Sequence, residues 1–257
     1  MDFHENSSAW TSDSRDYTIG AIVSFKVSPL PMENLCPYIE KGVKDGLPIL
    51  FVSGFPDNEV SGWGQEFPAE LEKKYRCIFM CLPGYSKDRI PAQDRAWGYD
   101  QDEVLTMMEA TIAATGLNKD KFIMIAHDWG AFYAILYNTR HTNAVSKLVL
   151  CDIGLLDPIN LPVATVPYLL FYQIYFAVTY IISQVISYKL ANVIFWMLKS
   201  CFQFMMPTPN DRFHLPEKEI TVRKCYPYYW LWRRLLTRSM LPAKFPTCPL
   251  LFMVSIF

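Results

Sequence analysis

Short apolar runs recur through the first half of the chain, each closed by a polar, glycine-containing or proline-containing segment. They lie at 20–27, 47–56, 77–82, 121–125 and 147–152. The last four lack the alternation of a strand with one wet face, so we interpret them as strands buried on both faces. The first is rich in β-branched residues, which also favours a strand.

Helical patterns separate these runs. Residues 100–115 carry apolar side chains at 104, 105, 108, 112 and 113, the spacing of an amphipathic helix, and 131–137 predicts a second helix. Strands that alternate with helices form a parallel sheet covered on both faces. We therefore expect an α/β fold with a mostly parallel sheet.

The pattern changes after the last of these strands. No charged residue occurs from 158 to 188, apolar residues dominate as far as 206, and a core-strand pattern returns at 249–254. The expected organisation is a flexible tail at 1–16, a core at 17–154, a helical cap at 155–241 and a return to the core at 242–257. One domain with an insertion suits a chain of 257 residues.

The uncharged stretch at 158–188 has two interpretations. It is long enough to span a bilayer, which takes about 20 mostly apolar residues. Its repeated tyrosines, together with Gln173 and Gln184, also suit cap helices that line an apolar chamber. Association with a membrane surface is compatible with either structure.

Charge and cysteine usage narrow the partners and the compartment. Lys and Arg total 24 against 25 Asp and Glu, without basic runs, which argues against nucleic acid. The seven cysteines are scattered, without a Cys-x-x-Cys pair, and indicate thiols in a reducing compartment; we predict no metal and no cofactor. The polar start lacks the features of a secretory signal, so we expect a cytoplasmic protein or one bound to the cytoplasmic side of a membrane.

Residues 126–130, Ala-His-Asp-Trp-Gly, stand between a predicted strand and a predicted helix. Small residues at both ends and an acid in the middle form the pattern of a nucleophile elbow, with Asp128 where serine is more usual. The small residues allow backbone to crowd backbone in a sharp turn that lifts the Asp128 carboxylate toward a cleft. An aspartate here could also be an ordinary helix N-cap, but its flanks favour a nucleophile.

Three motifs in order make the chain resemble an α/β-hydrolase of the epoxide hydrolase and haloalkane dehalogenase branch. They are His127–Gly130 at the elbow, Ser53–Asp57 in the place of the family's oxyanion loop, and Leu82–Ser86 after the following core strand. The resemblance implies a mostly parallel sheet with helices on both faces and an α-helical cap inserted after Asp152. Ser53 stands where the family has a histidine.

By this resemblance, Asp128 would attack an sp3 carbon and the backbone N–H groups of Phe55 and Trp129 would form the oxyanion hole. Tyr229 is the cap tyrosine nearest the family's proton-donor segment, and Asp152 would be a supporting acid. Phe55 favours an epoxide hydrolase over a dehalogenase, whose branch places Asn or Glu there. The implied substrate is a hydrophobic small molecule.

The family's base histidine follows the last core strand, and no histidine follows His214 in these 257 residues. We therefore expect a shortened, catalytically incomplete form, since a general base contributes about 10²–10⁴-fold to its step. His127 is expected to point away from the cleft, and His214 belongs to the cap. Two alternatives stay open, a membrane-associated binding protein without catalysis and a hydrolase resembling a haloalkane dehalogenase or an esterase.

Overall fold

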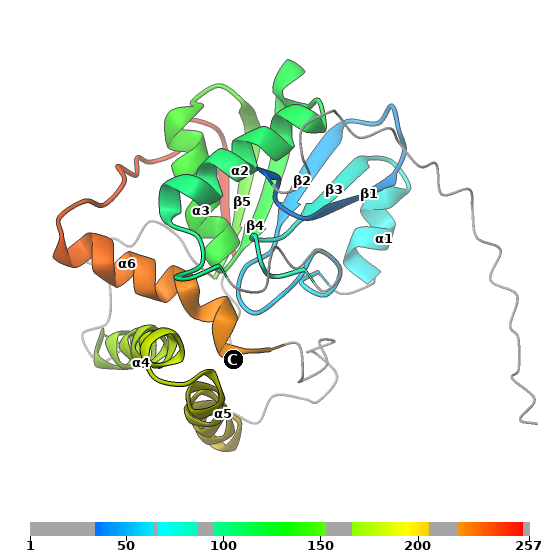
Figure 1. Cartoon of the computed structure of the whole chain (residues 1–257). Coiled ribbons are helices and arrows are strands. Elements are labelled where there is room, and N and C mark those ends of the chain that lie inside the picture. Colours follow the sequence, from blue (N-terminus) through cyan, green and yellow to red (C-terminus); the bar gives the residue numbers. More distant parts are fainter. Residues whose placement is uncertain (1–33, 64–65, 87–94, 153–165, 206–219, 254–257) are drawn as a thin grey trace, which may run out of the picture.

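The computed structural model describes residues 34–63, 66–86, 95–152, 166–205 and 220–253 (Figure 1). The predicted tail at 1–16, the predicted strand at 20–27 and His214 lie outside these residues.

A six-stranded sheet forms the centre of the molecule. Its strands are β1 (Tyr38–Gly42), β2 (Pro48–Val52), β3 (Arg76–Met80), β4 (Phe122–His127), β5 (Val145–Cys151) and β6 (Leu250–Met253), in the spatial order β1-β3-β2-β4-β5-β6. Only β1 runs antiparallel to its neighbour, and the other pairs are parallel. The mostly parallel sheet is therefore confirmed, including the strand expected at 249–254.

Helices cover both faces of the sheet, which is why the central strands are apolar on both sides (Figure 1). Leu50 and Val52 of β2 belong to the larger core beneath α2 (Gln101–Ala114) and α3 (Trp129–Arg140). Ile49 and Phe51 belong to the smaller core on the side of α1 (Glu66–Glu72).

The helix predicted at 100–115 is confirmed as α2. Asp100 caps it, because its carboxylate accepts from the backbone N–H of Glu103 while the Glu103 side chain accepts from the N–H of Asp100. This reciprocal pair fixes where the loop from β3 enters the helix.

Helices α4 (Val166–Val185), α5 (Tyr188–Met205) and α6 (Tyr226–Leu236) come between β5 and β6 in the chain. They gather beyond the end of the sheet where β4 runs into α3 (Figure 1). Tyr180 of α4 is buried and its ring packs on Tyr229 of α6. The described part of the uncharged stretch is thus a cap helix, one of its two predicted structures.

The sequence pattern did not predict β1 or α1. β1 contains Glu40 and Lys41, and it holds the sheet edge partly through an ion pair in which Arg76 Nε lies 2.6 Å from Glu40 Oε1. α1 has seven residues with a proline inside, too short for a helical period. β6 is the last strand of the described sheet, and all four of its residues are exposed.

Candidate active site

The turn between β4 and α3 places Asp128 in a conformation that few L-residues adopt. Its φ is 53° and its ψ is −129°, between a strand that ends at His127 and a helix that begins at Trp129. Such a conformation costs about 1–3 kcal/mol and persists only where the surroundings impose it. Here the N–H of Asp128 donates to the Cys151 carbonyl, and its own carbonyl accepts from Ala131. The elbow is therefore strained and braced.

Two glycines let the elbow sit against the strand beside it. A Cβ on Gly130 would lie 2.3 Å from the Val52 carbonyl oxygen, which no small shift would relieve. A Cβ on Gly54 would lie 2.5 Å from the Trp129 nitrogen. The predicted need for small residues around Asp128 thus has a direct steric cause, and it extends to Gly54.

One predicted oxyanion donor points at Asp128, the predicted nucleophile. The backbone N–H of Phe55 donates to Asp128 Oδ1 across 2.6 Å. Burial raises the pKa of Asp128 to about 6, and the charge of His127 and the N–H groups of Trp129 and Phe55 oppose that rise. The carboxylate is thus desolvated yet still ionised near neutral pH, which suits a nucleophile.

An aromatic wall from the cap packs on Phe55 and Trp129, beside this carboxylate. Tyr228 of α6 meets Trp129 edge to face at 4.9 Å between ring centroids and meets Phe55 at 5.6 Å. Tyr172 of α4 lies 6.2 Å from Tyr228. Burial is the larger cause of a raised pKa in both tyrosines, and the charge of Asp128 raises both further. These two phenols therefore share the electrostatic environment of the nucleophile.

The structure places Tyr229, the predicted proton donor, elsewhere. Its ring stacks on Trp97 at 4.9 Å and lies 5.9 Å from Tyr180. Successive residues of a helix point about 100° apart, so Tyr228 and Tyr229 cannot face the same space. The direction in which each tyrosine of α6 points cannot be predicted from a run of aromatic residues.

His127 and Asp152 form a pair that the sequence did not predict. His127 Nε2 lies 3.0 Å from Asp152 Oδ2, and the imidazole also packs edge to face on Trp63 at 6.3 Å. Trp63 belongs to the smaller core on the side of α1, on the opposite face of the sheet from α3. The predicted supporting acid therefore binds the histidine before the elbow, and that histidine faces away from the aromatic wall.

A second residue that sequence reasoning missed is Lys224. Its ammonium group is buried and donates to the Pro56 carbonyl across 2.8 Å, joining the cap to the loop that carries Phe55. The Tyr85 hydroxyl donates to the Lys224 carbonyl. The one available signal in the sequence was a lysine just before the aromatic run that begins at Tyr226. Among the described residues, no group of three His, Cys, Asp or Glu could hold a metal ion.

Comparison with known proteins agrees with this geometry. A sequence profile of the α/β hydrolase fold matches residues 48–181. The chain is 32% identical over 116 residues to epoxide hydrolase 1 of Caenorhabditis elegans, which covers 45% of this chain and 27% of that protein. It is 28% identical over 143 residues to epoxide hydrolase 3 of Mus musculus, covering 54% of this chain and 37% of that protein.

Solved structures give the same fold. An epoxide hydrolase of Vigna radiata superposes with a TM-score of 0.58 at 21% identity, over 84% of this chain and 74% of that one. A thermophilic esterase from Thermogutta terrifontis superposes with a TM-score of 0.54 at 14% identity, over 85% and 74%. The matched segment, its elbow and its cap show that the chain belongs to the α/β-hydrolase family, in the epoxide hydrolase-like branch.

Proposed function

We propose that this protein opens a hydrophobic epoxide by forming an ester on Asp128. The observation that carries the proposal is the Asp128 carboxylate itself, which is held at a strained turn and hydrogen-bonded by Phe55. The ring of Tyr228 packs on Phe55 and Trp129, and the ring of Tyr172 packs on Tyr228. A desolvated carboxylate is a stronger nucleophile than a hydrated one, and the phenols are placed to meet a departing oxygen.

In the proposed step, a carboxylate oxygen of Asp128 forms a bond to one epoxide carbon as the bond from that carbon to the ring oxygen breaks. The ring oxygen takes a proton from Tyr172 or Tyr228 and becomes a hydroxyl, because a bare alkoxide is a poor leaving group. The N–H of Phe55 stays on the oxygen that becomes the ester carbonyl.

Phe55 supports an epoxide over an alkyl halide. Its side chain packs on Tyr228 and on Phe176 of α4 and offers no N–H or O–H group to hold a departing halide. The same ring belongs to a cluster of aromatic side chains beside Asp128, which supports a hydrophobic substrate.

We further propose that this chain is catalytically incomplete and accumulates the ester. Hydrolysis needs a water deprotonated beside the ester carbonyl. Of the two histidines in the described residues, His127 packs on Trp63 on the side of α1, and His141 lies at the far end of α3 from Asp128. Neither is therefore placed to serve as that base. The aligned segments span 27–37% of the curated relatives' length, so the relatives' full activity enters only as part of this proposal.

Intact-mass spectrometry after incubation with an aryl epoxide tests both parts. We expect a mass increase of one epoxide, mapped by peptide sequencing to Asp128 and absent from the matched variant Asp128→Asn. An unmodified Asp128 would overturn the nucleophile. Repeated turnover without an accumulated adduct would overturn the incomplete cycle and leave the nucleophile in place.

A further inference from the structure

Helices α4 and α5 turn a broad apolar face outward. The exposed side chains of this face are those of Phe171, Ile174, Val178, Val185, Leu190, Val193 and Met197. Val193 and Met197 are 60% and 62% exposed, and only 17% of the most apolar stretch of α4 is buried. By length and composition α4 could cross a membrane, yet it packs on the rest of the cap. We call this surface the α4–α5 face.

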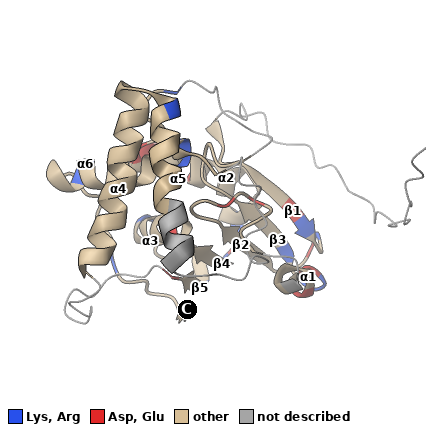
Figure 2. Ribbon diagram, turned by 90° about the horizontal axis from the view of Figure 1, so that it is seen from below, with Lys and Arg blue, Asp and Glu red and all other residues tan. Residues whose placement is uncertain are grey.

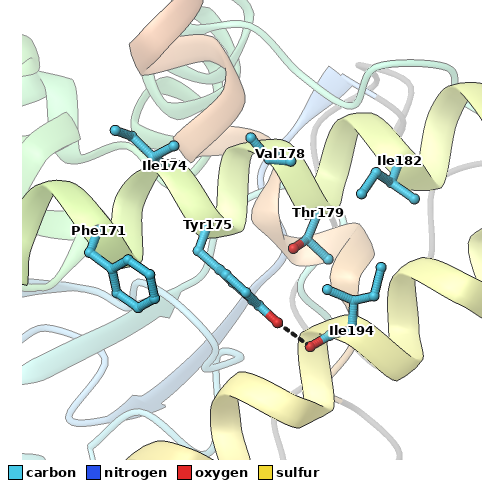
Figure 3. Close-up of a pocket in the computed structure, with 7 residues that line it drawn as sticks. All are labelled: Phe171, Ile174, Tyr175, Val178, Thr179, Ile182 and Ile194. Atoms are coloured by element: carbon cyan, nitrogen blue, oxygen red, sulfur yellow. Dashed lines mark hydrogen bonds between the residues drawn. The ribbon is translucent and has the colours of Figure 1, made fainter.

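A groove runs across the α4–α5 face. It has a volume of about 310 Å³ and is lined by Phe171, Ile174, Tyr175, Val178, Thr179, Ile182 and Ile194 (Figure 3). The one phenol among them, Tyr175, donates its hydroxyl to the Ile194 carbonyl. The groove therefore offers hydrocarbon contacts with few polar groups to satisfy, which suits an acyl chain.

The charged residues in the described part of the cap and in the segment that follows it have one sign. Residues 166–205 and 220–253 contain no Asp or Glu in the sequence, but they contain eight basic residues. Those with exposed side chains are Lys189, Arg223, Arg233, Arg238 and Lys244. Figure 2 shows α4 without a charged residue along its length. Lys189 is the second residue of α5. The guanidinium group of Arg223 stacks on the ring of the neighbouring Tyr188, 4.6 Å from its centroid.

We propose that the α4–α5 face docks on the surface of an anionic lipid bilayer, with the groove holding part of an acyl chain. A protein partner would be expected to form about one hydrogen bond per 100–200 Å² of interface, and α4 presents little to pair with. Hydrocarbon makes no such demand, and the basic residues attract anionic headgroups. Resting on the function proposed above, this docking brings the protein to the bilayer, where lipophilic epoxides concentrate.

Vesicle co-sedimentation of the full chain tests the docking. Phosphatidylcholine vesicles are compared with vesicles that also contain phosphatidylserine, for the wild type and for Ile174→Glu combined with Val193→Glu. The matched control combines Leu47→Glu with Val60→Glu, which alters two apolar residues of the core that are at least as exposed. We expect binding that requires phosphatidylserine and that falls at least about tenfold in the first variant only.

Three results would overturn the proposal. They are equal binding by the two variants, binding that ignores phosphatidylserine, and absence of binding. Light scattering without vesicles tests whether a second copy of the chain covers the α4–α5 face. A wild-type dimer that is monomeric in the first variant would show this and overturn the lipid docking. The Asp128 adduct is measured in parallel with a short, water-soluble epoxide. Adduct formation without vesicle binding removes the docking alone, and vesicle binding without an adduct removes the proposed function alone.

Discussion

The buried ammonium group of Lys224 donates to the Pro56 carbonyl across 2.8 Å, and Pro56 directly follows the residue whose N–H binds Asp128. One cap residue thus anchors the loop that binds Asp128, the proposed nucleophile. Asp57, next in the loop, is largely buried, and burial raises its pKa while the charges of His127 and Lys224 oppose that rise. The side chain of Lys224 therefore joins the cap to the loop that binds Asp128.

Replacing Lys224 by methionine should slow Asp128 alkylation by about tenfold or more, because a small displacement of the Phe55 N–H is costly at a reacting centre. The measurement is the rate of adduct formation under single-turnover conditions. Lys224→Arg should restore part of the rate, and Arg223→Met, next to it but exposed, should leave it unchanged. A loss of melting temperature with an unchanged rate would show that Lys224 stabilises the cap and has no positioning role.

The rate of alkylation should depend on pH through Asp128. Its pKa is raised to about 6, and only the carboxylate attacks, so the rate should rise with pH and level off above about 7. A plot of the single-turnover rate against pH gives the midpoint directly. A midpoint near the ordinary aspartate value would show that the carboxylate is hydrated and not buried.

The same shift predicts a stability effect of opposite sign. The folded state binds the Asp128 proton more tightly than the unfolded state, so the wild type should lose stability as pH rises from about 4 to 6, by at most about 3 kcal/mol. Asp128→Asn removes this loss. Denaturation curves at pH 4 and pH 7 should therefore show that the free energy of unfolding of the variant, relative to that of the wild type, is larger at pH 7. The same stability difference between variant and wild type at both pH values would contradict a raised pKa of Asp128.

More of the fold than of the candidate site could be predicted from the sequence. The runs at 47–56, 77–82 and 121–125 became β2, β3 and β4 because burial on both faces leaves an unambiguous composition. The elbow could also be predicted from the sequence, because the close approach of the Val52 carbonyl requires a glycine at position 130. The sequence could not show whether Tyr228 or Tyr229 points toward Asp128, because that depends on the rotation of α6 within the cap.

The pairing of His127 with Asp152 was also beyond the sequence. His127 ends β4 and Asp152 directly follows β5, and they meet only through the parallel register that sets His127 opposite Cys151. Lys224 shows the same limit, because its acceptor lies 168 residues away in the chain. Local patterns identify what is buried, but contacts between distant segments follow from how the cap sits on the core.

Tyr172→Phe and Tyr228→Phe should each slow alkylation, and the double variant should slow it by about 10²–10⁴-fold if the phenols share the proton transfer. Tyr229→Phe is the matched control on the same helix, since its ring stacks on Trp97. Adduct formation with an aryl epoxide is again the readout. A control as slow as Tyr228→Phe would restore Tyr229 as the donor.

Gly130→Ala should unfold or severely destabilise the protein. The new methyl group would lie 2.3 Å from the Val52 carbonyl oxygen, and backbone on both sides prevents escape, so a loss of about 3 kcal/mol or more is expected. Gly116→Ala is the control, because nothing lies within 4 Å of its Cβ and only its φ of 74° opposes the substitution. That change should cost about 1–2 kcal/mol. Chemical denaturation compares the two, and equal losses would mean that β2 and the elbow can separate without cost, which would remove the steric basis for a small residue after Trp129.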